Sequence, residues 1–361
     1  MNYRTTKLLD GTDVGASGTK VIDVNVQQPI SRIRLYWQVT MPNVKAMNSY
    51  QHRDISKIEL VDGSDVLFSM NGGQAQALCI YDRKIPTMNY KQKLPENSLA
   101  SNYGIDFGRF LHDPMLALDP TRFRNLQLKI TYDEDVAKSG VTANELEVIA
   151  DLFDEKVISP IGFLMSKEHY SATPPSAGYS YIDLPTDHPF RKLLIQGYLS
   201  GYEPWYTVSE ARLDEDNEKK IPFDWNIERY YRMMQAEWTP VEEGLIGDAT
   251  VGGAAFYMTP TDYYTIPAIM SAGGTVAGVT CSSWQRGGVV TLLSIGGVQG
   301  AMGIVRGYLP NHCVEFPFGD PKDIDDWYDV TKLGSLRLRL KVGTYSASAI
   351  QAVVLQQLRR Y

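Results

Sequence analysis

The chain has 361 residues, which is more than one hydrophobic core usually covers and enough for two domains of ordinary size. Its formal net charge of −7 at pH 7 argues against a general nucleic-acid binder, so no sequence-specific nucleic acid is expected as a partner. Cys79, Cys281 and Cys313 form no CxxC motif, which disfavours a disulfide framework or a thiolate zinc site and favours folding in a reducing compartment.

The first twenty residues are polar and contain several glycines. Because they have so few apolar side chains, we expect residues 1–20 to form a flexible N-terminal arm that becomes ordered only against a partner. Deleting residues 1–18 is then expected to leave a folded subunit but to impair its assembly. Met1–Asp10 also lacks the apolar stretch of a secretory signal peptide.

Short strands and turns follow in the first half of the chain. Val21–Trp37 reads as two alternating strands that are interrupted at Pro29. Ile55–Phe68 is predicted to be a hairpin because an Asp-Gly turn lies between its two apolar runs. Gln74–Tyr81 is predicted to be a short helix.

Part of the first half is repeated in the second. Asp119–Ile130 and Asp329–Leu340 each begin with a polar turn and continue with apolar residues at alternate positions, the pattern of a strand with one buried face. Two further blocks match in the same order, namely Val21–Leu35 with Tyr181–Ile195 and Ile55–Phe68 with Val208–Phe223. Three matched blocks in one order indicate a duplicated domain, in which Leu126 corresponds to Leu336 and Ile22 to Ile182.

The second half contains a helix and a long insertion. Asn226–Met234 has apolar residues at helical spacing and predicts a short helix packed on a sheet. Residues 239–307 are rich in Gly, Ala and Thr, and we expect them at one end of a barrel or at a subunit contact. Val289–Val305 is too short and too interrupted by glycines for a membrane-spanning helix, and it predicts two buried strands. The side chains expected to be buried there are those of Val289, Val290, Leu292, Leu293 and Ile295.

Many short alternating strands with frequent turns, and only one short helix per half, predict an all-β protein rather than an α/β protein. The expected fold is two tandem jelly-roll barrels, that is, a double jelly roll. The expected domains are the arm at residues 1–20, a first jelly roll at 21–155, and a second at 156–361 that carries the insertion at about 239–307.

These repeated blocks resemble the double jelly-roll major capsid proteins of tailless icosahedral DNA viruses, especially the membrane-containing bacteriophages. The segments that carry the resemblance are Ile30–Trp37 with Phe190–Tyr198, Ile55–Phe68 with Val208–Phe223, and Asn125–Ile130 with Ser335–Leu340, together with the short helix after the hairpin in each half. The resemblance covers nearly the whole chain. It is one of architecture and order, because no short motif defines that family.

The resemblance implies a structural protein with no catalytic activity and no cofactor. In that family three copies form a pseudo-hexagonal homotrimer, and homotrimers tile the icosahedral virion beside neighbouring capsomers, penton proteins and minor capsid proteins. An internal lipid membrane lies under the shell of some members. A location in the virion capsid, after synthesis in the host cytoplasm, follows from the same resemblance.

Two other classes of function compete with this interpretation. One is a glycan-binding spike or receptor-binding protein, in which Trp205, Tyr206, Trp225 and Trp238 would stack on sugars. The other is a two-barrel enzyme such as a bicupin or an amidase, which is disfavoured because no HxH or HxxxH spacing would gather a metal site. The histidines are His52, His112, His169, His188 and His312.

An acidic turn in the second half has some features of a calcium-binding loop. Asp214, Asp216 and Glu218 offer oxygens at alternate positions, but Lys219 stands where the turn glycine of such a loop belongs. An ordinary hairpin turn is the favoured interpretation, and no metal ligands are assigned.

The candidate interface residues are basic. Arg337, Arg339 and Lys341 alternate with leucines, so they are predicted to share one face of a strand, either as a solvated face or as a contact with an acidic neighbour or with lipid headgroups. Arg359 and Arg360, near the end of the sequence, are expected to contribute to assembly through their charge.

Overall fold

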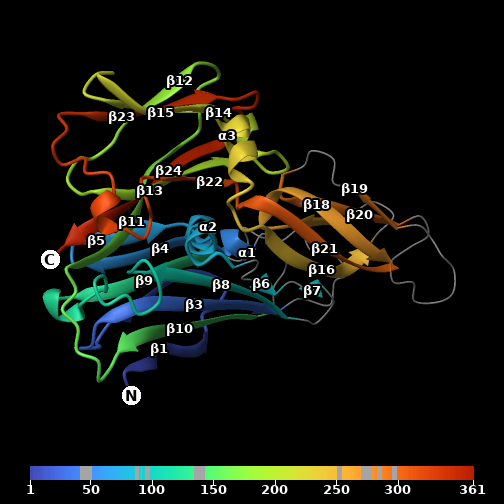
Figure 1. Cartoon of the computed structure of the whole chain (residues 1–361). Coiled ribbons are helices and arrows are strands. Elements are labelled where there is room, and N and C mark those ends of the chain that lie inside the picture. Colours follow the sequence, from blue (N-terminus) through green and yellow to red (C-terminus); the bar gives the residue numbers. More distant parts are fainter. Residues whose placement is uncertain are drawn as a thin grey trace.

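The computed structural model describes the chain as two β-barrels with an additional lobe at one side (Figure 1). The described residues are 1–40, 51–85, 89–90, 92–93, 98–133, 143–249, 254–269, 279–282, 287–294 and 299–361. None of the helices in these ranges is long and apolar enough to cross a membrane.

The first barrel packs two antiparallel sheets face to face. One sheet has the order β1-β10-β3-β8-β6, and the other begins with β2-β9-β4-β5. The strands are β1 (Tyr3–Asp13), β2 (Ser17–Asp23), β3 (Ile30–Thr40), β4 (Ile55–Asp62), β5 (Asp65–Met70), β6 (Asn89–Tyr90), β8 (Ser98–Asp106), β9 (Leu126–Asp133) and β10 (Ala143–Phe153).

The second barrel repeats this arrangement. Its sheets run β11-β24-β13-β22 and β12-β23-β14-β15, which is the strand order of the first barrel. The strands are β11 (Gly162–Ala172), β12 (Tyr179–Asp183), β13 (Phe190–Tyr198), β14 (Val208–Glu215), β15 (Lys220–Asn226), β22 (Cys313–Pro317), β23 (Leu336–Val342) and β24 (Ile350–Arg360). The all-β double jelly roll that the sequence predicts is therefore confirmed.

The duplication extends to the register of the strands. In the first barrel Leu128 of β9 lies between Ile22 of β2 and Leu60 of β4. In the second barrel the corresponding neighbours of Leu338 on β23 are Ile182 and Leu213. The pairs Leu126/Leu336 and Ile22/Ile182 thus occupy equivalent strands, as predicted.

The matched polar turns also make the same hydrogen bonds. Asp119 Oδ1 accepts from Thr121 N at 3.1 Å, and Asp329 Oδ1 accepts from Thr331 N at 3.1 Å. A side chain that caps its own backbone favours a tight turn over continuation of the preceding strand. The same Asp and Thr therefore have the same local role in both turns.

Each barrel encloses its own apolar core. Trp37, Leu128 and Ile130 are fully buried in the first core, and Tyr231, Leu338 and Phe190 in the second. Alternation places these side chains inward because successive side chains of a strand point to opposite faces.

The two barrels are joined through strands as well as side chains. Phe68 and Ser69 of β5 pair in parallel with Ser166 and Lys167 of β11, so one eight-stranded sheet runs from the first barrel into the second. The first core continues across this junction, because Phe163, Met165, Leu194, Cys313 and Val354 of the second barrel belong to it.

A helix follows the hairpin in each barrel, as predicted. Helix α2 (Gly72–Arg83) begins with a capping box at Asn71, and α3 (Ile227–Met234) begins at Asn226, whose side chain accepts from Arg229 N. In α3 the predicted apolar stripe is buried at Ile227, Tyr230 and Tyr231. A single turn, α1 (Gln51–Asp54), also occurs before β4 and was not predicted.

The insertion forms a lobe rather than a set of loops. Its strands are β16 (Val241–Ala249), β17 (Ala254–Tyr257), β18 (Pro260–Ile269), β19 (Val279–Ser282), β20 (Val289–Ser294) and β21 (Gln299–Pro310). They form the sheets β18-β21-β16-β7 and β17-β20-β19, the former with β7 (Gln92–Lys93) from the first half. In Figure 1 this lobe projects to one side, next to α1, α2 and α3.

The predicted burial of the insertion is confirmed for two of the five named side chains, whereas Ile304, in the second of the expected strands, is 49% exposed. Val289 and Val290 are buried. The side chains of Leu292, Leu293 and Ile295 lie outside the described residues. The two strands expected within Val289–Val305 are present, but they belong to different sheets.

The expectation of a flexible arm at residues 1–20 requires correction. Tyr3–Asp13 forms β1, which pairs with β10 from Tyr3↔Phe153 to Asp13↔Glu145, and β2 begins at Ser17. The segment is held by backbone hydrogen bonds to a neighbouring strand, which do not require apolar side chains, and its few apolar residues, Leu8, Leu9 and Val14, pack against the first core. A composition poor in apolar residues therefore did not imply an unstructured segment here.

Candidate assembly surfaces

The sheet β12-β23-β14-β15 presents the predicted basic residues on its outer face. Along β23 the leucines are buried, whereas Arg337, Arg339 and Lys341 alternate with them and point away from the core. The prediction that the three cations share one strand face is confirmed.

Each of these cations has an acidic partner on a neighbouring strand or turn. Arg337 Nε lies 2.7 Å from Asp183 Oδ1 on β12, and Lys341 Nζ lies 2.9 Å from Glu210 Oε1 on β14. The carboxylates raise the pKa of both cations through these hydrogen bonds. The face is therefore a ladder of ion pairs rather than a free positive stripe, and an acidic neighbour would have to compete with partners already in place.

Arg339 lies in the middle of this ladder, between Asp214 Oδ2 at 2.5 Å and the carboxylate of Glu218. Its hydrogen bond lowers the pKa of Glu218 below the ordinary value. Tyr181 is 60% exposed and lies over the Arg339 guanidinium at 5.8 Å from the ring centroid. Exposed Tyr and Arg are enriched at protein–protein contacts, which this face resembles in composition.

In the acidic turn next to the ladder, Asp216 accepts hydrogen bonds from backbone amides of the same chain. Asp216 Oδ1 accepts from Gly334 N at 2.8 Å and from Ser335 N at 3.0 Å, as Asp62 Oδ1 accepts from Arg124 N and Asn125 N in the first barrel. Residues 216–218 have positive φ, which marks a tight turn. Within the described ranges, no group of three or more His, Cys, Asp or Glu side chains could hold a metal ion.

Arg359 acts within the chain rather than at its surface. Its Nη1 lies 3.0 Å from Asp65 Oδ1 on β5, so the pair connects the last strand of the second barrel to the first barrel. The guanidinium holds the pKa of Asp65 below its ordinary value. Arg360, the other predicted basic residue, is exposed.

A buried group of charges lies where α2 meets the second barrel. Asp82 Oδ1 accepts from Arg191 Nη1 and from Lys192 Nζ, both at 2.7 Å, and Lys192 also binds Glu315. All four side chains are less than 10% exposed. Burial alone would raise the pKa of Asp82, but the charges of Arg191 and Lys192 lower it well below its ordinary value. Because the charges balance, the group links the barrels without leaving an unpaired buried ion.

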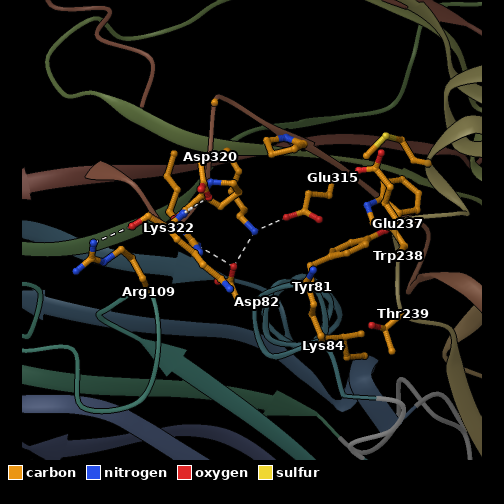
Figure 2. A pocket seen from close by; sticks show the side chains of 17 residues that line it. Tyr81, Asp82, Lys84, Arg109, Glu237, Trp238, Thr239, Glu315, Asp320 and Lys322 are labelled. Atoms are coloured by element: carbon orange, nitrogen blue, oxygen red, sulfur yellow. Dashed lines mark hydrogen bonds and ion pairs between the residues drawn. The ribbon is translucent and has the colours of Figure 1, made fainter. Parts of the chain in front are cut away.

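A cavity of about 450 Å³ lies beside this charge group. Figure 2 shows Arg109 and Lys322 at one end, Trp238 and Thr239 at the other, and Asp82 and Glu315 between them. Arg109 Nη1 donates to the Lys322 carbonyl at 2.8 Å. The polar groups of the wall are thus largely engaged with one another, and we assign no ligand to the cavity.

The charge group was missed in the sequence, although a signal was present. Phe190–Ile195 is an apolar strand interrupted by two adjacent cations, Arg191 and Lys192. Adjacent residues of a strand point to opposite faces, so one of two adjacent cations must face inward or into a junction. The acid partner, Asp82, is more than a hundred residues away, and only the fold brings it there.

The aromatic residues of the glycan hypothesis do not form one exposed platform. Trp205 stacks on Tyr231 at 5.6 Å between ring centroids, and Trp238 packs against Tyr81 at 5.4 Å. Trp225 is 37% exposed and rests on Tyr230. These rings contribute mainly to packing around α3.

The histidines are dispersed through the fold. His112 stacks on Tyr3, His169 is bonded to the Asp183 carbonyl, and His188 lies near Asp187. His312 is fully buried beneath the insertion lobe, and this burial lowers its pKa to about 4. The side chain of His52 lies outside the described residues.

Comparison with solved structures places this architecture among viral capsid proteins. No protein-family model matches the chain, and no curated protein matches it in sequence. The chain is similar in structure to the atomic structure of Sulfolobus turreted icosahedral virus, with 13% identity, a TM-score of 0.62, and coverage of 99% of this chain and 90% of that chain.

The major capsid protein of bacteriophage PM2 is also similar, with 10% identity, a TM-score of 0.56, and coverage of 99% of this chain and 98% of that chain. VP54 of PBCV-1 has 11% identity and a TM-score of 0.58, with coverage of 99% of this chain and 93% of that chain. At such identities the similarity concerns the fold, and it extends over both barrels. The chain thus has the double jelly-roll fold that these viral capsid proteins share.

Proposed function

We propose that this protein is the major capsid protein of an icosahedral virion, a structural subunit without catalytic activity. The observation that carries the proposal is the match of both barrels, over 99% of the chain, to major capsid proteins of several viruses. A duplicated barrel supports this role because it supplies two similar building blocks, in a fixed relation, from one chain.

In this proposal three copies form a homotrimer whose six barrels make a pseudo-hexagonal capsomer. Capsomers then contact neighbouring capsomers, penton proteins and minor capsid proteins to close the shell. Repeated contacts between identical subunits close into rings or shells when the rotation between neighbours allows it. The outer face with Arg337, Arg339 and Lys341, and the exposed Arg360, are proposed contact surfaces for a neighbouring subunit or for an internal lipid membrane. The virion capsid is the proposed location, after synthesis in the host cytoplasm.

Native mass spectrometry of the purified chain tests this proposal. We expect a species with three times the mass of the 40.5-kDa chain, and closed particles in electron micrographs at high protein concentration. A chain that stays monomeric across the accessible concentration range, and forms no particles with or without its neighbouring gene products, would contradict the proposal.

A further inference from the structure

In the described part of the chain, β1 and β15 are two of the strands that lie at the edge of a barrel sheet. β1 is the last strand of one sheet and β15 is the last strand of another. In Figure 1 β15 lies at the top and β1 at the bottom, so the two edges cannot meet within one chain. Exposed edges tend to pair with another chain unless they are blocked or covered.

The same two kinds of edge already meet once inside the chain. β5 corresponds to β15 and β11 to β1 in the duplication, and β5 pairs with β11. The register makes the correspondence specific to single residues. Phe68 pairs with Leu60 and Phe223 with Leu213, so Phe68 and Ser69 correspond to Phe223 and Asp224.

The partner strands correspond equally closely. Thr5 and Thr6 pair with Asp151 and Ala150 of β10, as Ser166 and Lys167 pair with Gln356 and Leu355 of β24. Both strands also carry a register shift at the same point, between Lys7 and Leu9 in β1 and between Glu168 and Tyr170 in β11. β1 therefore has the backbone shape that receives β5 inside the chain.

Exposure differs between the two edges in the way that a missing partner would produce. Met70 and Leu78, at the internal junction, are 1% and 5% exposed. The corresponding residues of the second barrel are Trp225 in β15 and Met233 in α3, which are 37% and 53% exposed. Apolar groups that are covered at one junction are thus uncovered at the equivalent place, and burying them would be favourable.

An ion pair at the internal junction has a counterpart with the charges exchanged. Inside the chain Arg359 of β24 binds Asp65 of β5. The residue corresponding to Arg359 is Asp154, which directly follows β10, and the residue corresponding to Asp65 is Lys220 of β15. The Lys220 side chain is 68% exposed and that of Asp154 is 25% exposed. Two junctions of the same shape would thus each contain an acid opposite a base.

We propose that β15 of one copy pairs in parallel with β1 of a second copy, with Phe223 beside Thr5, Asp224 beside Thr6, and Lys220 opposite Asp154. The inference rests on the homotrimer of the proposed function and identifies the contact that builds it. The contact is head-to-tail, and it closes when six barrels, from three chains, complete the ring. In the closed ring every β5-type edge meets a β11-type edge, three times within chains and three times between them.

The exchanged charges add specificity to this contact. Arg359 and Asp154 sit at equivalent places with opposite signs, so the second junction rejects the charge pattern of the first. If β5 paired with β1 of another copy during folding, before it pairs with its own β11, Asp65 would lie opposite Asp154. Repulsion between these two carboxylates disfavours pairing of β5 with β1 of another copy. It therefore favours the β15–β1 contact.

A pair of engineered cysteines tests the contact directly. We expect Lys220→Cys together with Asp154→Cys to form a disulfide between copies under mild oxidation, giving linked dimers and trimers on a non-reducing gel. The matched controls are the two single variants, which should remain unlinked, and Tyr181→Cys with Asp154→Cys, because Tyr181 is exposed on β12, at the opposite edge of the same sheet from β15.

Charge exchange provides a second test that does not depend on disulfide geometry. Lys220→Asp alone and Asp154→Lys alone should each weaken the trimer by roughly tenfold, and the double exchange should restore it. Circular dichroism and the melting temperature of each variant confirm that the subunit itself is folded.

The outcomes separate this inference from the function on which it rests. A wild-type trimer without cysteine linkage and without rescue by the double exchange would overturn the β15–β1 contact and leave the capsid role standing. Linkage that stops at dimers would mean a two-fold contact and would also overturn it. A wild-type chain that never trimerises would refute the homotrimer itself.

Discussion

The sheet β1-β10-β3-β8 of the first barrel corresponds to the sheet β11-β24-β13-β22 of the second. The inner faces of these two sheets are both apolar, but their outer faces differ in what covers them. In the second barrel the outer face of β13 and β24 is covered by the first barrel and carries Leu194, Val354 and the buried Lys192. In the first barrel the equivalent face of β3 and β10 carries Arg34 and Asp151, which form an ion pair at 2.7 Å with Arg34 about half exposed. A residue facing inward is constrained by its own barrel, whereas a residue facing outward follows whatever covers it.

The largest expected effect concerns the edge of the first barrel. Deleting residues 1–14 removes β1 and exposes the backbone of β10, so we expect the melting temperature to fall by roughly 10 °C or more. Differential scanning calorimetry measures this change, and circular dichroism reports the loss of sheet. An unchanged melting temperature would mean that β1 is dispensable and that residues 1–14 behave as a free arm.

The covered face can be tested at its buried charges. Asp82→Ala leaves Arg191 and Lys192 buried without their shared acid, and breaking such a group costs about 3–5 kcal/mol of unfolding free energy. Arg4→Ala is the control, because Arg4 pairs with Asp154 at a partly exposed site and its removal should cost less than about 1 kcal/mol. Urea titration of both variants provides the comparison. Equal losses of unfolding free energy in the two variants would mean that the buried charges at Asp82 contribute no more than the partly exposed ion pair of Arg4.

The inner faces should respond alike in both barrels. Leu128→Ala and Leu338→Ala remove equivalent side chains that are fully buried, so each should lower the unfolding free energy by about 2–5 kcal/mol. If the barrels unfold as one unit, which their continuous sheet favours, both variants will shift a single transition. Two transitions, each moved by only one variant, would show that the barrels unfold separately.

His312 provides a pH-dependent test at the base of the insertion lobe. Burial lowers its pKa to about 4, whereas an unfolded histidine has a pKa of about 6.5. The unfolded state therefore binds the proton first, and stability is lost as the pH falls from about 6.5 to 4, by about 3 kcal/mol in total. His312→Gln should flatten this part of the pH profile in urea titrations. A variant with an unchanged profile would assign the acid sensitivity to other groups.

Much of the framework could be predicted from the sequence alone. Alternating leucines in Leu126–Ile130 and Leu336–Leu340 determine a strand with one buried face, and the repeated Asp and Thr before them determine the same turn twice. The helix at Ile227–Met234 followed from its apolar spacing, and the face with Arg337, Arg339 and Lys341 followed from alternation. These features can be predicted because they depend on residues close together in the sequence: the spacing of apolar residues in a strand or helix, and the side chain that caps a turn.

Other features were decided only by the tertiary structure. β1 is mostly polar, with Leu8 and Leu9 packed against the first core, and its backbone pairing with β10 could not be predicted from so few apolar residues. The ion pairs that neutralise the candidate interface, and the group around Asp82, join residues that are far apart in the chain. The pattern of neighbouring residues predicts whether a side chain faces inward. The contact of an outward side chain depends on the tertiary structure, because its partner comes from another strand, the other barrel or another copy.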